Sequence, residues 1–453
     1  MFKKIPFWIL PFFIVIFIII LIFYGAVLRE ALKPHKSKYF PYLHKVSVFI
    51  AEIPKNLMQI RGIAGGEMTV RDRFNKKGGF KILKKIPRDE ILLLSRYDGD
   101  IKQSVVEIID LQNFKTIHIY KPNYKKINEK VNINNKEFVK NNITNKPNRF
   151  RIHHPIISNN LDIIFHSENS PFISLNKCGN INWINQDDSY HHSVEIDEEG
   201  NYWTPSYIYP YELNKFFTGT IHEDYLDDGI SKISKDGKTL YKKSLSNILI
   251  ENDLVGLLFG INEQYYHDPL HLNDIQPALE DGNFWRKGDL FLSIRNRSLI
   301  VLYRPETNKI IKLIWGPFSR QHDIDIISKD EISIFDNNNV STINGNEVME
   351  SSEVLIFNFK ENSFTSYLKN SIAEQSVLSG VEGLQHITKD DSLLIEDNAD
   401  GRILFFSSSG ELLWEYINKA KDGKIYRLNW SRLIEEEEKI KLIKQNTIGL
   451  KCS

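Results

Sequence analysis

The feature that most constrains this chain is a repeated unit of two short β-type runs joined by a turn, with the second run usually closing on an aromatic residue. About six copies occur, roughly 50 to 70 residues apart, at residues 105–120, 172–184, 230–245, 300–315, 354–368 and 403–417. A period of this length, built from paired strands, is typical of repeat architectures in which each unit packs on its neighbours.

Most copies follow another pair of β-type runs separated by a turn, for example at residues 192–204, 323–335 and 384–397. Four strands per repeat and about six repeats predict an all-β fold, a six-bladed β-propeller, because radial closure leaves only short, protected strand edges. A solenoid of stacked hairpins is the alternative that the same pattern allows.

Ahead of the repeats, an almost uninterrupted apolar run extends from Ile5 to Leu28 and follows two lysines. It is long enough for a helix to cross about 30 Å of hydrocarbon, which takes roughly 20 residues. Only Gly25-Ala26 resembles a signal-peptide cleavage site, so the run favours a retained single-pass membrane anchor over a cleaved signal. Basic residues flank the run on both sides and leave its orientation open.

The chain is predicted to consist of four parts: a transmembrane anchor at 1–30, a helical or irregular connector at 31–89, the propeller at 90–425, and a helical tail at 426–453. Within the propeller, the Asn- and Lys-rich stretch at 123–148 has few apolar positions, which favours an exposed loop. The acidic and then basic residues of the tail are typical of a solvated helix.

Charge and cysteine content exclude several function classes. The chain has 58 basic and 58 acidic residues and no nucleic-acid-binding motif, so we expect no nucleic-acid partner. Cys178 and Cys452 are too few for a disulfide framework and form no Cys-x-x-Cys pair. The nearest imitation of a phosphate loop, KDGKT at 235–239, lacks the first glycine of that motif, so we expect no nucleotide cofactor.

Four histidines fall in register when the repeats are aligned on their inner hairpins: His154, His192, His271 and His322. In a propeller the first strand of each blade lines the central channel, so these imidazoles are predicted to converge at one mouth of that channel. A single histidine at a strand start is most often a partly exposed residue satisfied by a neighbour. A shared position across several repeats favours a common site instead.

The ends of the second strands are expected to point to the same mouth, and they carry Arg96, Glu168, Arg295, Asp336 and Asn337. Three other histidines are expected to lie outside the set. His153 and His191 are expected to pack or hydrogen-bond between blades, and His386 is out of register, with Glu382 in the equivalent place.

Three segments carry a resemblance to a known family: HHSVEIDEEGNYW (191–203), HLNDI (271–275) followed by LFLSIRNRS, and FSRQHD (318–323) followed by IFDNN. Together they resemble the bacterial aryl-sulfate sulfotransferases, over roughly residues 90–418. The resemblance implies a six-bladed propeller that moves a sulfuryl group from an aryl sulfate to a phenolic acceptor without a nucleotide donor. It also implies that the propeller lies on the periplasmic, extracytoplasmic side of the membrane.

The resemblance also implies roles for individual residues. His322 matches the histidine that is transiently sulfated, and His271, Arg295 and His192 match the other catalytic positions. Asn273 matches the asparagine beside the second histidine and is expected to bind substrate. We place three further residues with it as substrate-binding: His154 from its place in the histidine register, and Arg96 and Asn337 from their strand-end positions. No cofactor or metal is expected.

These residue types suit sulfuryl transfer. A neutral imidazole at His322 can attack sulfur and hold the group as a labile N–S bond, which divides one displacement into two. Arg295 offers fixed, permanently charged donors for the sulfuryl oxygens. His271 or His192 can protonate the leaving phenolate and deprotonate the acceptor, since imidazole titrates near neutrality. Asp323 is a candidate for orienting His322.

Two alternatives belong to other classes. Channel-facing histidines with a carboxylate at Glu168 or Asp336 can bind a divalent metal, although the nearby Arg295 opposes this by charge. The chain can also be a non-catalytic, membrane-anchored binding propeller. Unlike the family's studied members, it shows no separate N-terminal β domain and no two neighbouring cysteines.

Overall fold

The computed structural model describes residues 9–31, 46, 49–50, 53, 68–84, 89–132, 150–209, 211, 213, 225–259, 266–342, 345–450 and 452. The chain divides into two compact units, one comprising residues 1–67 with 262–265 and the other the remainder. The predicted connector at 31–89 lies largely outside the described residues.

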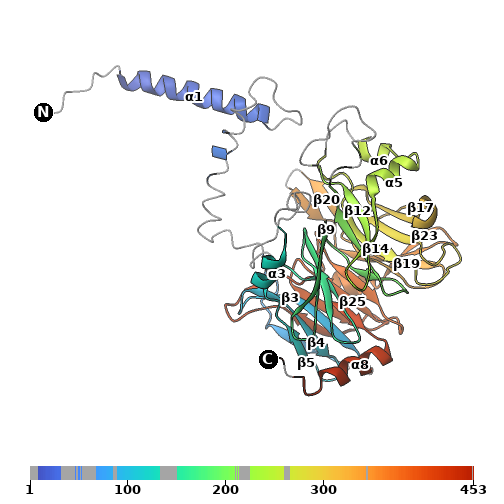
Figure 1. Cartoon of the computed structure of the whole chain (residues 1–453). Helices are drawn as coiled ribbons and strands as arrows, with labels where there is room; N and C mark the ends of the chain where they lie inside the picture. Colours follow the sequence, from blue (N-terminus) through green and yellow to red (C-terminus); the bar gives the residue numbers. More distant parts are fainter. Residues whose placement is uncertain are drawn as a thin grey trace. The chain divides into compact units, whose positions relative to one another are not determined.

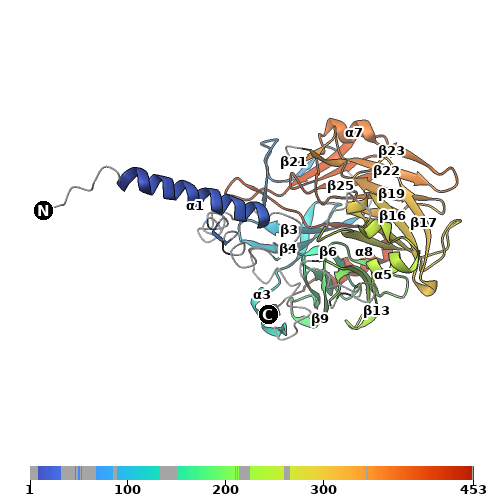
Figure 2. The same cartoon turned by 90° about the horizontal axis from the view of Figure 1, so that it is seen from above.

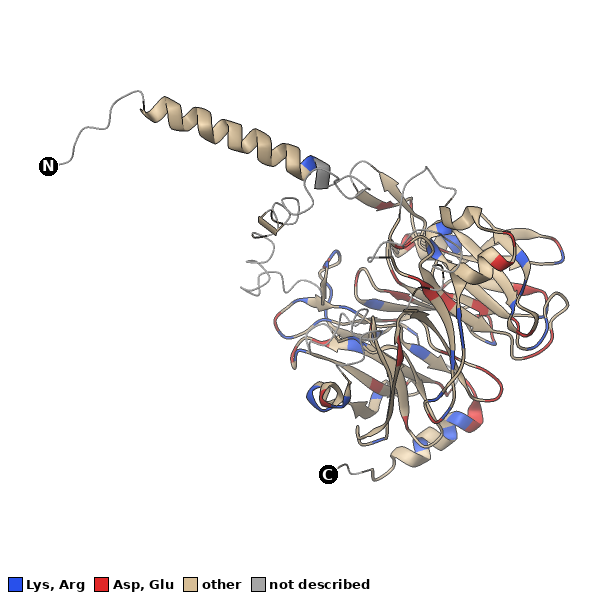
Figure 3. Ribbon diagram, turned by 45° about the horizontal axis from the view of Figure 1, so that its top comes forward, with Lys and Arg blue, Asp and Glu red and all other residues tan. Residues whose placement is uncertain are grey.

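The described part of the first unit is dominated by helix α1 (Ile9–Ala31), which has 23 residues. No charged side chain occurs in this helix before Arg29 in its last turn (Figure 3). Its length and composition are sufficient to cross a membrane, and a signal sequence would have the same properties.

The second unit is a propeller-like arrangement of antiparallel sheets that succeed one another in chain order (Figures 1 and 2). Four blade-like sheets are separate. They are formed by β29 (Arg432–Ile434), β3 (Ile91–Asp98), β4 (Gln103–Asp110) and β5 (Lys115–Tyr120); by β14 (Leu272–Pro277), β15 (Leu290–Ile294), β16 (Leu299–Arg304) and β17 (Lys309–Trp315); by β18 (Ile324–Ile326), β19 (Glu331–Asp336), β22 (Glu353–Asn358) and β23 (Ser363–Tyr367); and by β24 (Leu384–Ile387), β25 (Leu393–Asp397), β26 (Arg402–Phe406), β27 (Leu412–Ile417) and β2 (Gly79–Ile82).

The remaining large sheet has eight strands: β6 (His153–Ile157), β7 (Ile163–His166), β8 (Ser170–Leu175), β9 (Ile181–Tyr190), β10 (Glu195–Ile196), β11 (Tyr202–Tyr207), β12 (Asp228–Ile233) and β13 (Thr239–Ser244). It is continuous because the long strand β9 pairs with β11 through Tyr190 and Ser206. Four separate blade-like sheets are therefore observed where six were predicted. All six predicted repeat hairpins are present as antiparallel pairs.

Strands from both ends of the second unit complete its sheets. Strand β29, near the C-terminus, pairs with β3, and β2 pairs with β27 as a fifth strand. Two short pairs, β1 (Thr69–Val70) with β28 (Ile425–Tyr426) and β20 (Asn339–Thr342) with β21 (Gly345–Val348), lie outside these sheets. The helix expected from residue 426 is observed only as α8 (Glu437–Thr447), because the residues before it form β28 and β29.

Short helices occur between the sheets: α3 (Tyr124–Lys130), α5 (Leu245–Glu251), α6 (Gly256–Phe259) and α7 (Lys369–Glu374). Helix α3 falls inside the stretch predicted as an exposed loop. The Asn123 side chain accepts from the Lys126 N–H, which caps the helix, and Tyr124 and Ile127 are buried. Residues 133–148 of that stretch lie outside the described residues.

A disulfide joins Cys178, in the turn between β8 and β9, to Cys452 beyond α8. The pairing was not predicted, because 274 residues separate the two cysteines in sequence. Helix α8 is also fixed by packing, since Ile440 and Ile443 belong to the hydrophobic core beneath β3–β9.

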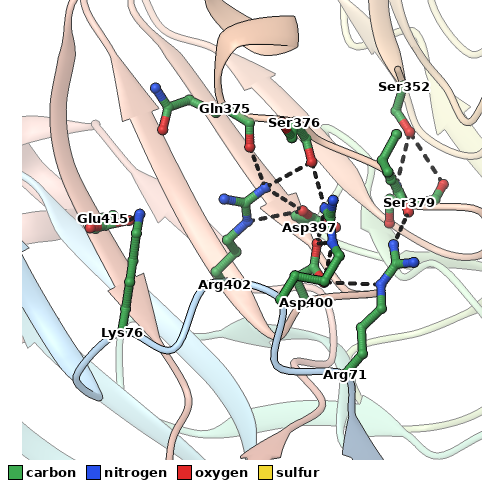
Figure 4. A network of polar contacts seen from close by, with 12 residues as sticks. Arg71, Lys76, Ser352, Gln375, Ser376, Ser379, Asp397, Asp400, Arg402 and Glu415 are labelled. Carbon is green, nitrogen blue, oxygen red and sulfur yellow. Dashed lines mark hydrogen bonds and ion pairs between the residues drawn. The ribbon is translucent and has the colours of Figure 1, made fainter. Parts of the chain in front are cut away.

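A network of buried charges attaches the segment before β2 to the last sheet (Figure 4). Arg402 donates from Nε to Asp397 Oδ2 at 3.0 Å, and both side chains are almost completely buried. Arg71 and Arg73 donate to Asp400. The ring of Phe74 lies 4.2 Å from the Arg402 guanidinium. The segment is therefore held by charge as well as by strand pairing.

We expect Arg402→Met to lower the free energy of unfolding by about 3–5 kcal/mol, because it leaves the buried Asp397 carboxylate without its cation. Denaturant unfolding of the purified chain measures this. The control is Lys84→Met at the Lys84–Glu411 pair, whose side chains are 62% and 52% exposed; its cost should stay below about 1 kcal/mol. Equal effects of the two substitutions would contradict the assignment.

Candidate active site

The start of the innermost strand repeats one backbone feature across the second unit. A non-glycine residue with positive φ lies at or just before each of these strands: His154 (38°), His192 (60°), His271 (59°), Arg320 (57°), Glu382 (58°) and Trp430 (63°). Such residues are uncommon and tend to occur where the surrounding structure dictates the backbone. His154, His192 and His271 therefore share a register because each occupies the same left-handed turn. In the fourth repeat Arg320 occupies the turn, and His322 follows it by two residues.

Three of the predicted histidines form a cluster. The His192 ring centroid lies 5.0 Å from that of His271 and 6.3 Å from that of His322. The structure thus brings together His192, His271 and His322, which come from three different repeats. His322 is 2% exposed and His192 9%, so the cluster is largely shielded from water.

His322 is held at both ring nitrogens. Its Nδ1 lies 2.5 Å from Asn337 Oδ1, and its Nε2 accepts from the Glu382 backbone N–H at 3.0 Å. The Asn337 amide cannot present its NH₂ group instead, because its Nδ2 donates to the carbonyls of Ser379 and Glu382. These contacts favour the tautomer with the proton on Nδ1 and a lone pair on Nε2.

The electrostatic surroundings also keep His322 neutral. Burial and then the positive charge of Arg295 lower the pKa of His322 to about 3. Arg295 follows β15, and its backbone N–H donates to the His271 carbonyl at 3.0 Å. Among the described residues no carboxylate forms an ion pair with Arg295, whose guanidinium donates to Asn296 Oδ1. Burial and the neighbouring Arg320 lower its pKa, yet it stays charged and available to an anion.

His271 is paired with a carboxylate that sequence reasoning missed. Its Nδ1 contacts Asp268 Oδ2, and its backbone N–H donates to Asp228 Oδ2 at 2.9 Å. Burial alone would raise the pKa of Asp268, but His271 lowers it below its usual value. This arrangement fixes the His271 ring and leaves its Nε2 for chemistry. The only sequence signal was the spacing of three residues.

His192 is oriented by its neighbour in the chain. The Nδ1 atoms of His191 and His192 lie 2.7 Å apart, so one of them carries the shared proton. Burial lowers the pKa of both rings well below the usual value. The His191 ring also stacks on Tyr207 at 4.1 Å, consistent with the expected packing role.

The other predicted substrate-binding residues lie in supporting positions. Asn273 Nδ2 donates to the Gln321 carbonyl at 3.0 Å and so supports the backbone before His322. His154 Nδ1 lies 3.3 Å from Glu195 Oε1, and the His154 ring packs against the Trp430 indole. Asn337, as described above, contacts His322 directly.

Arg96 and Asp323 have hydrogen-bond partners outside the histidine cluster. The guanidinium of Arg96 is held by Glu107 at 2.7 Å and Asp98 at 3.0 Å, and none of its observed partners contacts the histidine cluster. The Asp323 carboxylate accepts from the Gln385 backbone N–H at 2.9 Å, which directs it to the next sheet. Alternation along the strand turns it away from the ring of His322.

The carboxylates proposed for a metal site are also occupied elsewhere. Asp336 accepts from the backbone N–H groups of Ser319 and Asn338, both at 2.8 Å, and Glu168 is half exposed near Arg151. Within the described part of the chain no group of three or more His, Cys, Asp or Glu residues is arranged to hold a metal ion.

Sequence reasoning missed a second charged element beside His322. Arg151 donates to both carboxylate oxygens of Glu382, at 2.6 and 2.7 Å, and Asn398 donates to the same carboxylate at 2.9 Å. Burial would raise the pKa of Glu382, but Arg151 lowers it far below its usual value. The ion pair fixes the turn whose N–H contacts His322.

We expect Asn337→Asp to raise the pKa of His322 above about 3, because a negative charge beside Nδ1 favours the imidazolium. The ¹⁵N chemical shifts of labelled histidine, followed against pH, measure this. Asn338→Asp is the matched control, since the Asn338 amide donates to the Met349 carbonyl instead. An unchanged His322 pKa in Asn337→Asp would contradict the assigned contact.

Comparison with solved structures gives only distant likenesses. A protein of unknown function from Bacteroides caccae has 10% identity and a TM-score of 0.45, over 77% of this chain and 100% of that chain. A virginiamycin B lyase from Staphylococcus aureus has 15% identity and a TM-score of 0.35, over 60% and 71%. A streptogramin B lyase has 12% identity and a TM-score of 0.40, over 79% and 98%. At these scores the likenesses do not define a function.

No curated protein matches the chain in sequence. A family model, that of the arylsulfotransferases (ASST), matches residues 154–419, which is more than half of the chain and includes the whole histidine cluster. The chain therefore belongs to the arylsulfotransferase family.

Proposed function

We propose that the histidine cluster transfers a sulfuryl group from an aryl sulfate to a phenolic or other hydroxyl acceptor through a transient sulfohistidine at His322. Family membership supports a sulfotransferase in general. The observation that carries the finer proposal is the pair of contacts at His322, Nδ1 with Asn337 Oδ1 and Nε2 with the Glu382 N–H, which favour a neutral ring with its proton on Nδ1 and a lone pair on Nε2. A neutral imidazole with a fixed tautomer is ready to act as a nucleophile.

In the first half-reaction, Nε2 of His322 attacks sulfur, the N–S bond forms and the S–O bond to the phenol breaks. Nε2 must then give up its contact with the Glu382 N–H, which becomes available to a sulfuryl oxygen. Arg295 supplies charge to the same oxygens, where preorganised donors stabilise the transition state most. The imidazole becomes cationic, and its Nδ1–H remains bound to Asn337 Oδ1.

Protons pass through His271. Burial lowers the pKa of His192 well below its usual value and leaves that ring neutral, so the leaving phenolate takes its proton from His271. In the second half-reaction the acceptor phenol returns a proton to the same ring as its oxygen attacks sulfur and the N–S bond breaks. The Asp268 carboxylate contacts Nδ1 of His271 and fixes the orientation of the ring, so His271 suits this role. The sequence of two displacements predicts ping-pong kinetics.

The proposal includes a six-bladed count for the propeller. The eight-stranded sheet divides naturally into β6–β9 and β10–β13, because each half contains one predicted repeat and one inner-strand start with positive φ. With the four separate sheets this gives six blades. The pairing of β9 with β11 then joins two adjacent blades at one edge only.

We place the propeller outside the cytoplasm, on the periplasmic side, with α1 as its membrane anchor. The Cys178–Cys452 disulfide supports this side, because disulfides persist in oxidising compartments and are rare in the cytosol. The apolar helix α1 supplies the membrane contact.

The test uses the full chain purified in detergent and a chromogenic aryl sulfate, with and without an acceptor phenol and with a chelator present. We expect phenol release that depends on the acceptor and resists the chelator, together with sulfated His322 in peptide mass spectrometry after donor alone. His322→Asn should abolish both. Turnover without an adduct, or turnover that the chelator removes, would contradict the mechanism.

We expect Arg295→Met to lower kcat about 10²- to 10³-fold, because it removes donors aimed at developing negative charge. Steady-state kinetics with the same donor measure this. Arg286→Met, at an exposed arginine near the start of β15, should leave kcat unchanged. A similar loss in both variants would indicate a general effect of charge and contradict the role of Arg295.

A further inference from the structure

One inner-strand start carries a tryptophan in place of a histidine. Trp430 precedes β29, the strand that completes the sheet of β3, and has a φ of 63°. The equivalent turns in three other repeats carry His154, His192 and His271. The repeated backbone therefore delivers the Trp430 indole to the same place to which it delivers the imidazoles.

The indole contacts three imidazoles at once, those of His154, His192 and His322. Its ring centroid lies 5.5 Å from that of His154, 6.4 Å from that of His192 and 6.2 Å from that of His322, and each pair meets edge to face. Trp430 is completely buried. Its side chain thus packs, shielded from solvent, against all three rings.

Trp430 is fixed through its backbone, not through its indole. The Glu396 carboxylate accepts from the N–H of Trp430 and from that of Ser431, both at 2.7 Å. In the described structure the indole Nε1 has no hydrogen-bond partner. Burying a carboxylate costs free energy, which its two hydrogen bonds to successive N–H groups offset. These hydrogen bonds hold the left-handed turn at Trp430 and so orient the indole.

We infer that Trp430 is a positioning residue that sets the spacing of His154, His192 and His322 and keeps water away from the nucleophile. The inference rests on the proposed function, and it adds a residue that acts only through the histidines. Removing water disfavours the charged imidazolium, so the indole contributes to keeping His322 neutral. It also fixes the distances between the histidine rings. A misplacement of a catalytic group by about 1 Å can lower a rate about 100-fold.

The charges that face His322 are independent of Trp430. Arg295 after β15 opposes protonation, and Glu382 before β24 favours it, although Arg151 neutralises that carboxylate. The His192 and His271 rings face it from two further repeats, and Arg320 precedes it in its own. Exchanging Trp430 for a smaller apolar residue removes none of these charged or titratable groups. It changes only the solvation of His322 and the spacing of the rings.

The experiment compares Trp430→Leu with Trp414→Leu in the full chain. Trp414 is the matched control, because it is also completely buried and belongs to the same hydrophobic cluster. Among the described residues its ring contacts Phe80, Phe114 and Phe405 but no histidine. Both substitutions should lower Tm. We measure kcat, KM and the pH profile of phenol release, and the His322 pKa by ¹⁵N shifts.

For Trp430→Leu we expect kcat to fall about 10- to 100-fold with little change in KM. The acidic limb of kcat/KM and the His322 pKa should both move upward by at least about one unit, toward the unperturbed histidine pKa of about 6.5. Trp414→Leu should change neither, and Trp430→Phe, which keeps an aromatic edge, should restore most of the rate.

Equal kcat and pH profiles for Trp430→Leu and Trp414→Leu would overturn the inference while leaving the proposed function intact. Absence of turnover in the unmodified chain would overturn the proposed function instead. In that case the His322 pKa still decides the positioning role: an unchanged value in Trp430→Leu refutes it, and an upward shift supports it.

Discussion

The contact on which the site depends is the 2.5 Å approach of His322 Nδ1 to Asn337 Oδ1. A buried imidazole with no such partner would be free to adopt either tautomer. The Asn337 amide is itself fixed by two backbone carbonyls, so the proton stays on Nδ1 and the lone pair on Nε2. Burial and Arg295 then keep the ring uncharged. His192 and His271 lie beside this one oriented imidazole.

The fold supplies the cluster by repetition. A residue with left-handed backbone conformation lies at or just before each innermost strand. The histidines of the cluster lie at or near these residues, and the turns direct their side chains toward one another. The buried carboxylates Asp268, Glu396 and Glu382 hold the turns or the rings beside them, each with identified donors. Such charges are expensive to bury and are stable only because every one is paired or hydrogen-bonded. The closure of the first sheet by β29 brings the last turn, and Trp430 with it, into the set.

Much of this arrangement could be predicted from the sequence because it is periodic. The six hairpins and the convergence of His192, His271 and His322 follow from spacing alone. Features set by long-range contacts were not legible: the Cys178–Cys452 disulfide, the Arg151–Glu382 ion pair, and the strand β29 inside a predicted helical tail. The contact of the Arg96 guanidinium with Glu107 on the paired strand could not be predicted from strand direction, and the substrate-binding role of Arg96 stays a prediction. Two repeats form one sheet because β9 is long enough to pair with β11. The spacing of the repeats in the sequence does not predict the length of a strand.

The measurement that tests the central claim most directly is the stereochemical course at sulfur. An aryl sulfate made chiral with three oxygen isotopes is turned over by the full chain with a phenolic acceptor, and the configuration of the product is determined. Two successive displacements through His322 Nε2 predict retention of configuration, since each step inverts the sulfur centre. Inversion would show direct transfer between the two phenols and would contradict a sulfohistidine intermediate.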